Sequence, residues 1–168
     1  MLKKIVSIAV VPYVLWLIFA YQYHFIDGAN LLFHEAGHLV LSFMGPVVHF
    51  LGGTIGQLVF PTVCIISFLK KNQKFEAAIC GIWFGENMVN IAWYMGDAQT
   101  MMIPLVGGGI HDWNWLLYRA GLLAHCKILA GLVHIIAALI LIGSVIVLFQ
   151  QSFFTDSQQQ GNDPDIGF

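Results

Sequence analysis

Three residues with metal-binding and acid–base chemistry stand close together within residues 31–40, in the stretch Leu-Leu-Phe-His-Glu-Ala-Gly-His-Leu-Val. His34 and His38 are four residues apart, so on a helix their side chains lie on the same face, one turn from each other. Two imidazoles at this spacing can bind one Zn²⁺ ion. Glu35, beside the first histidine, can act as the base for a water molecule that the metal activates. The spacing therefore predicts a metal centre with hydrolytic chemistry.

The residues around this motif are apolar, which bears on its alternatives. A chance match of three residue types at fixed offsets is one alternative. Histidines that only cap a helix or pair locally are another. Ionisable groups inside an apolar stretch are costly unless something compensates them. A bound metal ion supplies that compensation, so we interpret the motif as a metal site.

A catalytic zinc site needs a third protein ligand and keeps a fourth position open. Three residues in or beside a Gly-rich region are candidates for that ligand: Asp97, His111 and Asp112. Imidazole suits zinc, and a carboxylate completes many hydrolytic sites, so residue type does not choose among them. Asp112 can instead be a plain N-cap of the helix that follows it. Asp97 can end a helix near the lipid headgroups, and His111 can be an ordinary loop residue.

A second polar set, Glu86, Asn87 and Asn90, lies inside the apolar segment 75–93. Asn87 and Asn90 are three residues apart and share a helix face. Polar groups inside a membrane often mark a functional site, and either amide could hold a substrate backbone or donate a hydrogen bond to an oxyanion. Hydrogen bonds between helices explain the same residues equally well.

The composition places the whole chain in lipid. Of 168 residues, 58% are hydrophobic and only 10% are charged, whereas a soluble domain carries about 25% charged residues. We therefore predict an integral membrane protein in a lipid bilayer. A net charge of −2 without a basic patch gives no indication of nucleic-acid binding. The three cysteines lack metal-binding spacing and are interpreted as small buried hydrophobic residues.

The apolar segments predict an all-α fold, a polytopic membrane helix bundle of about four to six helices with a Gly-rich re-entrant or irregular segment. We expect a single transmembrane domain over residues 1–150 and a polar, disordered tail over residues 151–168. The first apolar run is long enough to be a retained span instead of a secretory signal peptide. The expected helices are residues 5–23, 29–44, 58–69, 75–93, a short helix after 113, and 128–148.

The lysines predict how the chain is threaded through the membrane. If the N-terminal lysines are cytoplasmic, the first span goes outward and the His-Glu helix returns inward. A simple third span over residues 47–69 would then leave Lys70, Lys71 and Lys74 outside, against the charge bias. We therefore expect the Gly-rich first part of that segment, a poor helix, to dip into the membrane and turn back. This multi-pass topology places residues 97–112 on the side where the His-Glu helix begins.

Phe33-His34-Glu35-Ala36-Gly37-His38, within a membrane helix, resembles the motif of the site-2 protease type of intramembrane zinc metalloprotease. In that family the two histidines bind zinc, the glutamate activates water, and an aspartate from a later segment is the third ligand. Residues 103–112 are loosely similar to that later segment, with Asp112 or His111 in the ligand role. Their glycine run precedes the acidic residue, whereas in the family it follows.

The resemblance implies a zinc-dependent peptidase that cleaves transmembrane or membrane-entering peptides, with Glu35 passing a proton to the leaving amine. The Gly-rich dip would pair with an extended substrate strand. The alternatives are a structural or transport metal site, and a relative that binds membrane peptides without cutting them. Three ligands beside an open cleft would favour the enzyme. A closed four-ligand site, or a continuous polar path across the membrane, would favour the non-enzymatic protein.

Overall fold

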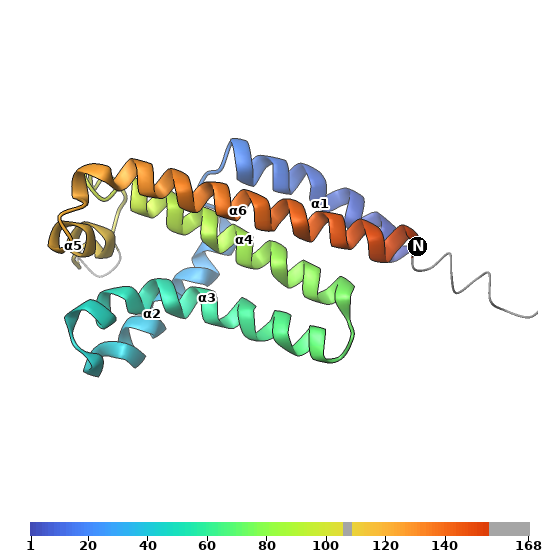
Figure 1. Ribbon diagram of the computed structural model, residues 1–168, viewed down its shortest axis with the longest axis horizontal. Helices are drawn as coiled ribbons and strands as arrows, with labels where there is room; N and C mark the ends of the chain where they lie inside the picture. The colour runs from blue at the N-terminus through green and yellow to red at the C-terminus, as the bar shows by residue number, and fades with distance from the viewer. Residues whose placement is uncertain (106–108, 155–168) are drawn as a thin grey trace, which may run out of the picture.

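The computed structural model, which describes residues 1–105 and 109–154, is helical throughout that part of the chain (Figure 1). The predicted all-α fold is therefore confirmed. The helices are α1 Leu2–Phe19, α2 Phe25–Leu41, α3 Pro46–Lys70, α4 Lys74–Gly96, α5 Asp112–Arg119 and α6 Cys126–Phe149. A π-helical segment, Gln150–Phe154, extends α6, so the first residues of the predicted tail are helical. The rest of that tail, and part of the Gly-rich stretch before His111, lie outside the described residues.

The core lies where α1, α4 and α6 run side by side (Figure 1). Leu17, Ile82 and Leu141 are buried there, one from each helix. Gly85 of α4 lets α6 approach closely, because a Cβ atom at this position would lie 2.7 Å from the Leu141 side chain. A second apolar cluster, which includes Leu117 of α5, fixes that short helix against α4 and α6. It thereby holds the N-terminus of α5, where Asp112 stands.

The contact between α2 and α3 is made by backbone and not by side chains. A Cβ atom on Gly37 of α2 would lie 2.0 Å from the carbonyl oxygen of Gly52 in α3. A Cβ atom on Gly56 would lie 2.3 Å from the carbonyl oxygen of Phe33. Backbone atoms cannot move aside as a flexible side chain can, so only glycine fits these positions. Small residues allow this close approach between helices in membranes.

These glycines do not break α3, which differs from our prediction of a re-entrant turn. The segment is one continuous helix of 25 residues. Glycine in a helix costs only about 1 kcal/mol relative to alanine, and the packing against α2 offsets that cost. The low helix propensity of the glycines was the wrong guide here because their partner, Gly37, lies on another helix.

The path of α2 also differs from the prediction, and it explains why no turn is needed. The carbonyl oxygen of Ile18 accepts a hydrogen bond from His134, inside α6, so α1 ends before the far end of the bundle. From there α2 continues away from the N-terminus, and α3 alone runs back (Figure 1). The Lys3 ammonium consequently lies 5.4 Å from the ring of Phe75, in the first turn of α4. The lysines around the α3–α4 turn therefore share an end of the bundle with the N-terminus.

Three helical stretches are long and apolar enough to cross a membrane: Leu2–Phe19, Pro46–Lys70 and Leu123–Phe154. Large apolar side chains project from their surfaces, including Ile8, Val63 and Leu139, which are between 58% and 65% exposed. Such surfaces are unfavourable in water and favourable in lipid. These features are those of a membrane protein.

We expect Gly56→Ala to destabilise the protein by about 1–3 kcal/mol, because the added methyl group would collide with the backbone of α2. Gly143→Ala is a matched control in α6, since no atom lies within 4 Å of the Cβ position there, and it should leave stability unchanged or raised. Thermal unfolding of both variants in detergent measures the difference. Equal melting temperatures would show that the α2–α3 contact tolerates a side chain.

Candidate metal centre

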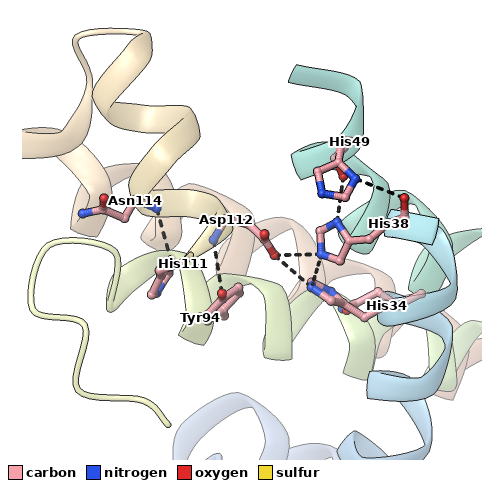
Figure 2. Close-up of polar contacts among 8 residues, drawn as sticks. His34, His38, His49, Tyr94, His111, Asp112 and Asn114 are labelled. Carbon is pink, nitrogen blue, oxygen red and sulfur yellow. Dashed lines mark hydrogen bonds and ion pairs between the residues drawn. The ribbon is translucent and has the colours of Figure 1, made fainter. Parts of the chain in front are cut away.

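His34 and His38 of α2 converge with Asp112, the first residue of α5 (Figure 2). Asp112 Oδ2 lies 2.9 Å from His34 Nε2 and 3.2 Å from His38 Nε2, and the two Nε2 atoms are 3.0 Å apart. Ligand atoms around a tetrahedral Zn²⁺ with bonds of about 2.1 Å lie roughly 3.4 Å from one another. A shift of a few tenths of an ångström would therefore admit the ion.

The hydrogen bonds of the two imidazoles fix which nitrogen faces the centre. His38 Nδ1 lies 2.7 Å from the carbonyl oxygen of His49, which can only accept, so Nδ1 carries the proton. His34 Nδ1 lies 3.0 Å from Gln57 Oε1. The amide nitrogen of Gln57 donates to the carbonyl oxygen of Asn87 at 3.4 Å, which turns Oε1 toward His34. Both Nε2 atoms are therefore free to bind a metal, as in histidine-bound metal sites generally.

These residues fit a divalent cation. With both Nδ1 atoms protonated, the lone pairs of two Nε2 atoms face a carboxylate oxygen, and no donor stands between these three acceptors. Burial raises the pKa of Asp112, but the contacts with His34 and His38 outweigh it and hold that pKa below its usual value. The carboxylate is therefore ionised at neutral pH. Two imidazoles and one carboxylate form a donor set that zinc uses in catalytic sites.

Gly53 of α3 leaves the room that this arrangement needs. A Cβ atom on Gly53 would lie 2.3 Å from His34 Nε2 and 2.6 Å from His38 Nε2. Any side chain at this position would displace the rings or fill the place of the ion. The same glycines that bring α3 against α2 therefore also clear the space beside the ligands.

His111, and not Asp112, caps α5. The backbone N–H of Asn114 donates to His111 Nδ1 at 3.2 Å, and the His111 ring stacks on Tyr94 with 4.1 Å between the ring centroids. Burial lowers the pKa of His111, so its ring is neutral at neutral pH. The N-cap role that we considered for Asp112 is thus filled by its neighbour, and the Asp112 carboxylate is available to the histidines.

Asp97 stands beside the centre and organises the loop after α4. Its carboxylate accepts hydrogen bonds from the backbone N–H groups of Met102, at 3.0 Å, and Ile103, at 2.8 Å. Its Oδ2 lies 3.8 Å from His111 Nε2. Of the three candidates for the third ligand, Asp112 joins the two histidines, whereas Asp97 and His111 lie closer to each other.

A cavity of about 600 Å³ adjoins the three ligands. Glu35 is exposed and lines it, as does Asn90 of α4. Asn87 is fully buried and donates to the carbonyl oxygen of Trp83 in its own helix at 2.9 Å. Of the two predicted amides, Asn90 therefore borders the cavity, and Asn87 holds α4 together.

The sequence analysis missed Gln57 and Gly53. Gln57 is the one amide side chain in α3, and a lone polar residue in an apolar helix is a signal of function. The role of Gly53 has no comparable signal, because it depends on which residues of another helix lie opposite.

No protein-family model, curated protein or solved structure matches this chain. The similarity to site-2 proteases stays a prediction from the residues around His34–His38 and from the stretch that ends at Asp112.

We expect Asp112→Ala to lose stoichiometric metal, because it removes the negatively charged ligand from the centre. Asp97→Asn is the matched control and should keep the metal, since its carboxylate binds loop N–H groups instead. Elemental analysis of the purified proteins after incubation with Zn²⁺ measures both. Loss of metal from the Asp97 variant, with retention in the Asp112 variant, would contradict the assignment.

Gln57→Leu should weaken zinc binding by about 10–100-fold, the usual effect of removing a hydrogen bond that orients a metal-bound histidine. Gln57→Glu keeps an acceptor for His34 Nδ1 and should bind zinc nearly as well as the wild type. Competition with a chromophoric chelator gives the affinities. Equal affinities for all three proteins would show that this hydrogen bond does not orient His34.

Proposed function

We propose that this chain is a multi-pass integral membrane peptidase that uses Zn²⁺ to hydrolyse peptide bonds of transmembrane or membrane-entering substrates. One observation carries the proposal: three converging ligand atoms, from His34, His38 and Asp112, border a cavity that Glu35 also lines. The similarity of residues 33–38 to the site-2 protease motif supports the same reaction.

His34, His38 and Asp112 would hold the ion. A bound Zn²⁺ supplies a Lewis acid that polarises a carbonyl group and lowers the pKa of water toward neutrality. Glu35, one residue from His34 and exposed to the cavity, would take a proton from the attacking water and pass it to the leaving amine.

Asn90 would orient the substrate. Its amide nitrogen already donates to Tyr21 Oη at 2.8 Å and to Asp27 Oδ1 at 2.9 Å. Both N–H groups are thus used, which leaves the amide oxygen to accept a hydrogen bond from a peptide N–H. An extended peptide offers such groups along its backbone. Asn90 would therefore position the substrate and not donate to an oxyanion.

The charge distribution orients the protein in our proposal. Five lysines, at positions 3, 4, 70, 71 and 74, precede or follow helices at the end of the bundle that holds the N-terminus. Arg119 and Lys127 belong to α5 and α6 at the other end. The positive-inside bias then makes the N-terminus cytoplasmic, and the metal centre lies in the half of the bundle away from the cytoplasm.

A non-catalytic structural or transport metal site is the alternative. Structural zinc sites are almost always closed by four protein ligands, whereas the group found among residues 1–105 and 109–154 has three. The adjoining cavity gives a substrate and a water molecule access to the ion. These two features favour the peptidase.

Glu35→Gln should keep its zinc and lose activity by about 10²–10⁴-fold, the range for removal of a general base. Glu76→Gln, in the first turn of α4, is the matched control and should cleave normally. Cleavage of a transmembrane reporter peptide in reconstituted vesicles, measured beside metal content, tests both. A Glu35→Gln protein that cleaves at the wild-type rate would remove Glu35 from the mechanism. A zinc-loaded wild type that cleaves no membrane peptide would favour the non-catalytic protein.

A further inference from the structure

A second group of ligand residues lies where α2 begins beside α4. It consists of His24, Asp27 and Glu86, and one ligand atom from each lies within 4.8 Å of the others. Asp27 and Glu86 are each 1% exposed. Within the described part of the chain, neither carboxylate forms an ion pair with a lysine or arginine. Two buried carboxylates need a compensating charge or proton.

Asp27 has no acceptor position left for a proton from Glu86. Its Oδ1 accepts hydrogen bonds from Tyr21, at 2.7 Å, and Asn90, at 2.9 Å. Its Oδ2 accepts from the backbone N–H of His24 at 2.8 Å and lies 2.6 Å from His24 Nδ1. A carboxylate offers about four such positions. A protonated Glu86 that shared its proton with Asp27 would displace one of these contacts.

Two ligand atoms of the group are buried without a hydrogen-bond partner. Glu86 Oε2 accepts from Asn30 at 2.7 Å and faces the Asn87 amide at 3.4 Å, but Oε1 has no partner. His24 Nδ1 has none either, because its short contact with Asp27 is not directed as a hydrogen bond. Buried polar atoms without a partner are rare and indicate an absent water or ion.

The other nitrogen of His24 is held as in metal-bound imidazoles. His24 Nε2 lies 2.9 Å from the Tyr13 hydroxyl group. If Nε2 carries the ring proton and donates it to this hydroxyl group, Nδ1 presents a lone pair toward Asp27. Histidine ligands generally donate their second N–H in this way.

We propose that His24, Asp27 and Glu86 bind a second divalent cation, Zn²⁺ or Mn²⁺, which joins the start of α2 to the middle of α4. The cation gives Glu86 Oε1 and His24 Nδ1 a partner and compensates the two carboxylates. It also fixes α2, the helix that carries His34 and His38, at its other end. The site stands on its own residues and does not depend on the peptidase proposal.

Equilibrium dialysis of the purified full chain in detergent against Zn²⁺ alone, and against Mn²⁺ alone, tests the proposal by metal content per chain. We expect two equivalents of at least one of these ions in the wild type and one in Glu86→Gln. The glutamine keeps the size of the side chain and an acceptor for Asn30. Glu76→Gln, on the same helix, should keep two. The double variant His34→Ala/His38→Ala should keep one, bound at the second site.

The two sites give distinguishable failures. One equivalent that is lost in His34→Ala/His38→Ala and unchanged in Glu86→Gln would overturn the second site and leave the first intact. One equivalent that survives the double variant and is lost in Glu86→Gln would support the second site and count against the first. If Glu86→Gln does not fold, His24→Gln is the substitute, and two equivalents in that variant would overturn the proposal.

Discussion

Close backbone contact between α2 and α3 is the constraint on which the candidate site depends. Gly37 meets Gly52 and Gly56 with no side chain between them. This contact brings Gln57 within hydrogen-bond distance of His34, and the carbonyl oxygen of His49 within reach of His38. A helix pair held apart by ordinary side chains would leave both imidazoles without the acceptors that set their tautomers. The orientation of the ligands therefore follows from the absence of Cβ atoms.

The second requirement is the position of α5. Asp112 comes from a part of the chain remote in sequence from α2, and its approach depends on Leu117, which packs with residues of α4 and α6. The His111 ring, stacked on Tyr94, caps the helix and determines which way the first turn faces. One apolar contact and one capping ring thus place a single carboxylate opposite two imidazoles.

Local features of the sequence predicted the local parts of this structure. The offset of four between His34 and His38 is a property of one helix, so the pairing of their rings could be predicted. The choice of Asp112 could not, since it depends on His111 taking the N-cap, and both residues were suitable for either role. The glycines of α3 misled the prediction for a related reason. Helix propensity is counted along one chain segment, whereas the value of a glycine here depends on the backbone opposite.

Asn87 belongs to the surroundings of both ligand groups. Its carbonyl oxygen accepts the hydrogen bond from Gln57, which holds His34, and its amide nitrogen faces Glu86. A rotation of this single turn of α4 would move the supports of both groups together. Strain that arises while either group adjusts its side chains is therefore shared with the other, and α4 acts as a common girder between them.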